Sequence, residues 1–65
     1  MNKVKGYRNM LNETQQEWAD MLSISRVSYI SKENKKTPFT DKEKVIIRNH
    51  ISKKIPGVTI DDLFF

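Results

Sequence analysis

The sequence contains no cysteine, and this absence excludes both a disulfide framework and a thiolate metal site. Only two glycines and two prolines are present, so a glycine-rich phosphate-binding loop is excluded as well. No apolar run reaches the roughly 18 residues of a membrane span, and the N-terminal segment MNKVKGYRNM lacks the apolar core of a signal peptide. These absences favour a cytoplasmic chain that makes no membrane contact.

Side chains for catalysis and metal binding are equally sparse. The single histidine, His50, has neither a cysteine nor a carboxylate at ligand spacing, so we expect it to be an ordinary residue of a helix face. Asp61 and Asp62 are adjacent at an expected helix start, where the helix dipole explains them. Trp18 falls at a helical core position and is expected to pack there. We therefore expect no enzymatic activity, no metal, no cofactor and no small-molecule ligand.

What the sequence does contain is an excess of positive charge. Its 65 residues allow one domain with a small core, and they include 12 Lys and Arg against 8 Asp and Glu, for a net charge of +4. Residues 1–36 carry seven of the basic and four of the acidic residues, so most of the excess lies in this half. This balance favours a polyanionic partner such as nucleic acid.

The spacing of apolar residues and of helix-capping residues predicts an all-α chain with four helices and a short fifth. Thr14 with Glu17, and Thr40 with Glu43, have the form of capping boxes at two of the helix starts. No stretch alternates between apolar and polar residues as a strand does. The expected helices cover residues 2–11, 15–22, 26–34 and 41–54, and a closing turn covers 60–65.

The apolar residues of the later helices predict the rest of the core. In the fourth helix Ile47, Ile51 and Ile55 follow one another at a spacing of four residues, and Val45 and Ile46 are expected to widen the same apolar face. The closing segment Val58–Phe65 has too many large apolar residues for a free tail. Two roles stay open for this segment, a dimer contact and a seal over the core of the monomer.

The most informative stretch runs from Thr14 to Asn34, where two short helices are joined by a tight turn. Such a unit lets a small chain hold a helix in a DNA groove. Its key residues are Thr14, Gln15, Glu17, Ala19, Ile24, Ser25, Arg26, Glu33 and Asn34. In these residues, and in the tail VTIDDLFF, the chain resembles the phage repressor and Cro (XRE-type) family of helix-turn-helix DNA-binding domains. The resemblance covers nearly the whole length.

This resemblance implies a fold, a partner and a setting. The fold would be a single compact lambda-repressor-like domain over residues 1–65, with the helix-turn-helix at about 15–34. The function would be that of a sequence-specific transcriptional regulator, a repressor or Cro-like protein of a bacterial or phage-infected cell. One recognition helix reads only a few base pairs, so we expect a homodimer on a double-stranded DNA operator with two-fold half-sites.

The resemblance also assigns roles to individual residues. Four are expected to contact base edges: Ser25, Arg26, Val27 and Ser31. A bidentate guanidinium matches guanine O6 and N7, and an apolar side chain suits a thymine methyl. Five others are expected to contact phosphates: Gln15, Ser28, Asn34, Lys35 and Lys36. The alternatives that stay open are a phosphate contact for Arg26, ordinary packing for Val27, and solvated charges for Lys35 and Lys36.

Three further residues are expected to shape the site. Ala19 must be small where the two helices of the motif cross. Arg8 and Glu33 resemble a family ion pair that joins the first helix to the end of the third, and breaking a buried pair of this kind is costly. The alternatives are a helix-favouring alanine and two unpaired surface charges. Gln15 has a second reading too, as a polar residue of the capping turn.

The chain departs from the family pattern at two loop positions. The glycine common in the turn of the motif is Ser23 here, and a left-handed serine costs on the order of 1 kcal/mol relative to glycine. The glycine that usually follows Glu-Asn is Lys35 here, so we expect Asn34 to adopt the left-handed conformation instead.

Two other functions stay open. An antitoxin of a toxin–antitoxin pair uses the same fold and also binds DNA, and a neighbouring toxin gene would identify it. A protein-interaction adaptor that has kept the fold without DNA binding is the second. Arg26 and Gln15 argue against the adaptor, because it has no use for them.

Overall fold

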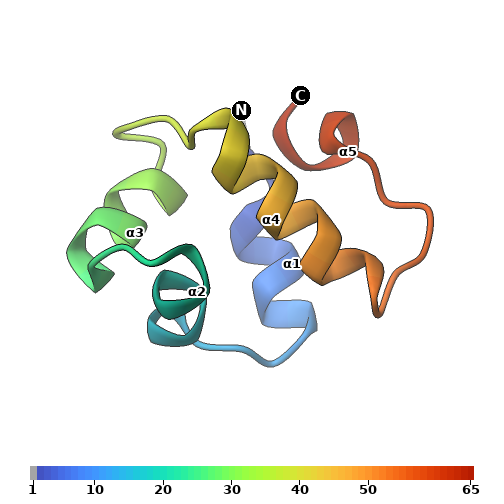
Figure 1. The fold of residues 1–65 in the computed structure, drawn as a ribbon, viewed down its shortest axis with the longest axis horizontal. Coiled ribbons are helices and arrows are strands. Elements are labelled where there is room, and N and C mark those ends of the chain that lie inside the picture. Colours follow the sequence, from blue (N-terminus) through green and yellow to red (C-terminus); the bar gives the residue numbers. More distant parts are fainter. Residues whose placement is uncertain (1) are drawn as a thin grey trace.

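The computed structural model describes residues 2–65, and every regular element in that range is a helix, which confirms the all-α prediction. In Figure 1, α2 and α3 lie together on one side, α5 lies on the other, and α1 and α4 run between them. The helices are α1 (Val4–Met10), α2 (Gln15–Leu22), α3 (Arg26–Glu33), α4 (Asp41–Ser52) and α5 (Ile60–Phe64). The expected range for α1 begins two residues too early and ends one too late, that for α4 ends two residues too late, and those for α3 and α5 end one residue too late.

Side-chain caps determine where α2 and α4 begin. The Thr14 hydroxyl accepts the Glu17 amide hydrogen at 3.1 Å, while the Glu17 carboxylate accepts the Thr14 amide hydrogen at 2.8 Å. The same reciprocal pair joins Thr40 and Glu43 at 3.2 and 2.9 Å. Both boxes satisfy amide groups that the first turn of a helix otherwise leaves without partners. They are the two boxes predicted from the sequence.

Left-handed residues end α1, α2 and α3. Asn12 and Ser23 both have φ of 58°, so the turn between α2 and α3 keeps a left-handed residue although it lacks a glycine. The expectation for Asn34 is wrong, because its φ is −83° and Lys35 is left-handed instead, with φ of 68°. The Asn34 amide still bonds the Ile30 carbonyl as in a helix, and this moves the reversal one residue along the chain.

The core lies between α1, the α2–α3 pair and the α4–α5 pair. Its eleven buried hydrophobic residues are Val4, Trp18, Ala19, Leu22, Tyr29, Phe39, Ile47, Ile51, Val58, Leu63 and Phe64. The closing segment therefore seals the core of the monomer through Val58, Leu63 and Phe64. Within that segment, Phe65 is 72% exposed.

The expectation for Val45 is wrong, because its side chain is 45% exposed. An α-helix turns 100° per residue, so Val45 points about 200° away from Ile47, which is fully buried. The core face of α4 is the narrower stripe that Ile47 and Ile51 share. None of the helices within residues 2–65 is long and apolar enough to cross a membrane.

Candidate nucleic-acid interface

The outward face of α3 is open to solvent and mixes small polar side chains with Arg26 and an exposed valine. Arg26, Val27 and Ser28 lie in its first turn and are all exposed, with Val27 reaching 75% exposure. Ser31, one turn further on, is only partly buried and lies on the same helix. A valine this exposed gains nothing from packing within the chain, so ordinary packing does not explain Val27. Its methyl groups are available to an external surface.

Ser25, also expected to reach a base edge, already has a structural role. Its hydroxyl oxygen accepts the Ser28 amide hydrogen at 3.1 Å and caps α3. The same hydroxyl donates to the Ser28 hydroxyl at 3.0 Å. Both side chains are exposed, but a new partner of Ser25 has to share or replace these bonds. Ser25 and Ser28 thus form a hydrogen-bonded pair of hydroxyl groups at the start of α3.

The inward face of α3 ends in a buried carboxylate with four hydrogen-bond donors. Glu33 accepts two bonds from Arg8, from Nε at 2.8 Å and from Nη2 at 3.1 Å. The Tyr29 hydroxyl donates at 2.6 Å and the Gln15 side-chain amide at 3.1 Å. We call these four side chains the Glu33 cluster. It connects α1, α2 and α3 at a single point.

The environment of Glu33 keeps its carboxylate ionised. Burial by itself raises the pKa of Glu33, but the bonds from Arg8, Tyr29 and Gln15 outweigh burial and hold the pKa below its ordinary value. Arg8 also donates from Nη1 to the Glu13 carbonyl at 2.8 Å. Every buried side-chain nitrogen and oxygen in the described residues has a hydrogen-bond partner. The cluster is thus fully satisfied, as a buried ion pair must be to persist.

Gln15 is therefore only partly available as a phosphate clamp. Its side-chain nitrogen is bound to Glu33, which leaves its side-chain oxygen and the first-turn amides of α2 for any external partner. Ala19 is fully buried, and α2 packs against α3. The small side chain at this position lets the two helices approach, as the crossing requires.

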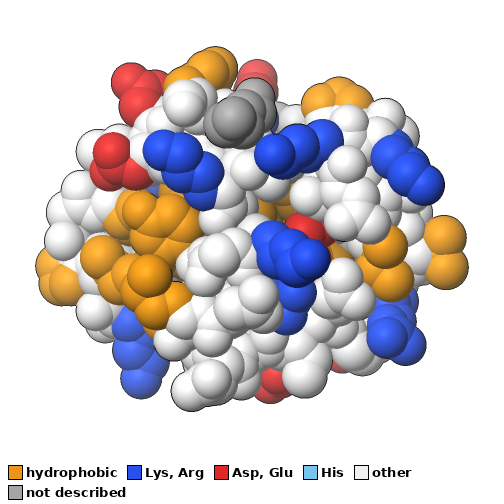
Figure 2. Space-filling model, turned by 180° about the vertical axis from the view of Figure 1, so that it is seen from behind, with side chains coloured by type: hydrophobic (Ala, Val, Ile, Leu, Met, Phe, Trp, Pro, Cys, Tyr) orange, Lys and Arg blue, Asp and Glu red, His pale blue; other side chains and the backbone are white. Residues whose placement is uncertain are grey.

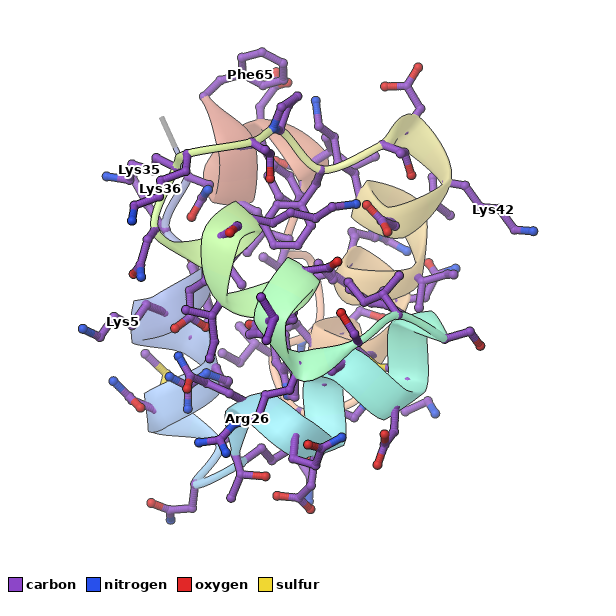
Figure 3. All side chains as sticks on the ribbon, turned by 90° about the vertical axis from the view of Figure 1, so that its left-hand side faces the viewer. Lys5, Arg26, Lys35, Lys36, Lys42 and Phe65 are labelled. Carbon is purple, nitrogen blue, oxygen red and sulfur yellow. The ribbon has the colours of Figure 1, made fainter. Side chains whose placement is uncertain are left out.

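Exposed lysines lie beside α3. Figure 3 places Lys5, Lys35 and Lys36 along one edge next to α3, with Arg26 further down the same side and Lys42 on the opposite side. Lys35 and Lys36 follow the end of α3, and Asn34 beside them is exposed too. The structure thus gathers three of the expected phosphate contacts at one end of the helix. Lys5, from α1, was not among the expected contacts.

Two other long-range contacts hold α4 in position, and sequence reasoning missed both. The Glu13 carboxylate lies 2.7 Å from His50 Nε2 and accepts the Trp18 indole hydrogen at 2.8 Å. Lys32 Nζ donates to Glu43 at 2.6 Å and so ties α3 to the start of α4. Glu13 and His50 are 37 residues apart, so no local pattern signals their contact. His50 is more than the ordinary helix-face residue expected from the sequence.

Residues 2–65 contain no group of three His, Asp or Glu side chains placed to hold a metal ion. Trp18 is 1% exposed and packs edge-on against His50 and Tyr29, as expected for a core residue. No protein-family model, no curated protein and no solved structure matches this chain.

Proposed function

We propose that this chain is a sequence-specific, double-stranded DNA-binding transcriptional regulator of the phage repressor and Cro type. In this proposal the fold is a lambda-repressor-like helix-turn-helix domain, with α2 and α3 as the motif and α3 in the major groove. Its role is binding, with no catalytic step. The observation that carries the proposal is the exposed face of α3, with Arg26, Val27 and Ser28 open to solvent, on a helix whose other face is fixed by the Glu33 cluster.

The shape and the charge of this surface support DNA as the partner. The major groove is about 12 Å wide and admits a single α-helix. Apart from Arg26 and the partly buried Ile30, the residues on the open face of α3 have small side chains, so they let the helix approach the base edges closely. Lys35 and Lys36 extend beside it, where the flanking phosphates of a bound duplex would run.

Within this proposal each side chain has a separate task. Arg26 reads guanine through a bidentate pair, and Val27 contacts a thymine methyl. Ser25 and Ser31 offer hydroxyl groups to neighbouring base edges. Phosphates are contacted by Gln15, Ser28, Asn34, Lys35 and Lys36. Gln15 takes part mainly by fixing Glu33, and through the α2 amides next to it.

We also propose that two copies bind one operator. Most of the closing segment is used inside the monomer, so only its outer residues remain for a dimer contact. Phe65 is 72% exposed and Ile60 is partly exposed. Figure 2 shows hydrophobic side chains gathered on the side of the molecule that carries α5 and the loop before it. A contact between so few exposed residues forms more readily on DNA, where the operator holds both copies in place.

A salt titration of duplex binding tests the proposal. A protein that neutralises phosphates loses affinity steeply as salt rises, with a slope of about −0.9 per phosphate contact in a log–log plot. We expect tight binding at low salt and a steep negative slope. Absence of any duplex binding at low salt would contradict the proposal.

A further inference from the structure

Gly6 lies in the middle of α1, and no contact within the protein requires a glycine at this position. It is exposed, and its backbone has ordinary helical angles. A Cβ atom built on it meets no atom within 4 Å, so packing does not require a glycine there. Glycine destabilises a helix interior relative to alanine. A bare backbone is useful at such a place when an external molecule approaches it closely.

The surface around Gly6 is concave and basic. A hollow of about 320 Å³ lies between α1 and the end of α3, and the lysines on its rim are Lys3, Lys5 and Lys35. We call it the Gly6 hollow. Its one acidic residue, Glu33, is neutralised by the two bonds from Arg8. The hollow therefore presents the positive charges of its rim lysines around Gly6, a helix position that has no side chain.

The position of the Gly6 hollow relates it to α3. It adjoins Glu33, Asn34 and Lys35, at the end of the helix proposed to enter the major groove. A helix with its side chains is about 10–12 Å across, which nearly fills a groove about 12 Å wide. The sugar–phosphate backbone of the duplex must therefore pass directly beside α3. Figure 3 shows Lys5 on that side, in line with Lys35 and Lys36.

We propose that the Gly6 hollow receives the sugar–phosphate backbone of the duplex that α3 reads, so that α1 is part of the DNA interface. Lys5 and Lys35 bind phosphates on either side of Gly6, and the missing side chain lets the backbone pass close to α1. The inference rests on the proposed function and extends its footprint beyond the helix-turn-helix.

Substitutions at Gly6 separate this role from a purely structural one. Gly6→Ala should raise the melting temperature, because alanine favours the helix and meets no neighbour. The same substitution should weaken binding to a labelled mixed-sequence DNA duplex, because it adds bulk where the backbone passes. Opposite effects on stability and on binding support the proposal. A more stable variant with unchanged binding contradicts it.

A pair of substitutions of equal size tests the charge. Gly6→Glu should bind the duplex on the order of tenfold more weakly than Gly6→Gln at low salt, and added salt should reduce the difference. Lys53, exposed after the end of α4, provides the control, since Figure 1 places that end of α4 far from α3. Lys53→Glu and Lys53→Gln should differ by no more than about twofold, the small effect expected of a distant screened charge. Circular dichroism confirms that all four variants are folded.

The possible outcomes are distinguishable. If the unsubstituted chain binds no duplex at low salt, the proposed function fails and the inference fails with it. If the unsubstituted chain binds but the Gly6 pair differs no more than the Lys53 pair, the Gly6 hollow is outside the interface and only the inference is overturned. Lys5→Ala gives a second reading, because loss of one phosphate contact should lower the salt slope by about 0.9. An unchanged slope contradicts a contact by Lys5.

Discussion

The helices α1–α3 and the helices α4–α5 are joined by different chemistry. The first three meet at the Glu33 carboxylate, which receives bonds from Arg8, Gln15 and Tyr29. The last two pack through apolar side chains, among them Ile47 and Leu63, and in the described residues no ion pair joins α4 to α5. Both groups contribute to one core, but only the first adds a buried polar network to it.

This difference matches what each group of helices has to do. Apolar burial is strong but non-directional, so it holds α5 on α4 without fixing fine angles. Hydrogen bonds to a buried carboxylate are satisfied only in a narrow range of geometry. The Glu33 cluster lies behind α3, and under the proposed function the orientation of α3 determines which base edges Arg26 reaches. We therefore expect the two groups to respond differently to substitution.

Arg8→Ala should have the largest effect. It leaves Glu33 buried without its cationic partner, and breaking a buried ion pair costs roughly 3–5 kcal/mol. In a domain of 65 residues a loss of that size leaves much of the chain unfolded at room temperature. Urea denaturation followed by circular dichroism measures it. Arg48→Ala in α4 is the matched control: it removes one bond to the Val58 carbonyl and should cost about 1 kcal/mol. Equal losses would remove the contrast between the two groups.

Leu63→Ala should lower stability by roughly 2–5 kcal/mol, because it leaves a cavity at a fully buried position between α4 and α5. At a temperature where the variant is still folded, its discrimination between target and random DNA should equal that of the unsubstituted chain. Titrations with both duplexes measure this ratio. A loss of discrimination would mean that apolar packing, too, orients α3.

Arg26→Ala should leave stability nearly unchanged, since Arg26 is exposed and forms no ion pair in the described residues. It should cost roughly 1–3 kcal/mol of binding on the target site and little on random DNA. Lys36→Ala is the comparison, because loss of a phosphate contact weakens all duplexes alike. Equal losses for Arg26→Ala on both duplexes would make it a phosphate contact, the alternative left open by the sequence.

The Glu33 cluster should also make stability depend on pH. The pKa of Glu33 is held below its ordinary value of 4.5, so its contribution is complete above about that pH and is lost as pH falls through the lowered pKa. Unfolding at acid pH lets the Glu33 carboxylate bind a proton. Glu33→Gln has no such carboxylate and should flatten the acid side of the plot of stability against pH. Thermal melting between neutral and acid pH measures the effect. A profile of equal slope in both proteins would contradict it.

Ser23→Gly should have the smallest effect, a gain of about 1 kcal/mol. Serine with φ of 58° is strained in the left-handed region, and glycine relieves that strain. Asn12→Gly in the turn before α2 is the comparison and should gain less, because asparagine tolerates this conformation. Thermal melting of the two variants gives the difference. A loss of stability in Ser23→Gly would contradict the claim that Ser23 is strained.

Local features of the fold could be predicted from the sequence. The two capping boxes at Thr14 and Thr40 depend on residues three positions apart, so their pattern is visible in the chain. The same holds for the apolar stripe of Ile47 and Ile51. The error at Val45 came from counting an apolar residue into this stripe although it lies on the other side of the helix. The error at Asn34 came from placing the reversal one residue too early, since the Asn34 amide still bonds the Ile30 carbonyl and Lys35 is the left-handed residue.

Long-range contacts could not be read from spacing. Two such contacts join Glu13 to His50 and Lys32 to Glu43. Both depend on how the helices pack, which the spacing of residues does not reveal. The resemblance suggested an Arg8–Glu33 pair, but it gave no indication of the four-donor arrangement around the carboxylate. Gly6 likewise looks unremarkable in the sequence, and only the empty space around it distinguishes it.

The most direct test of the central claim is a selection of bound sites from a random duplex pool at moderate salt. Our account predicts an enriched motif with two-fold symmetry and half-sites about 10 base pairs apart, one turn of DNA. It also predicts that Arg26→Ala loses the preference for guanine at one position of each half-site. Retention of duplexes without any enriched sequence would contradict the claim that α3 reads bases.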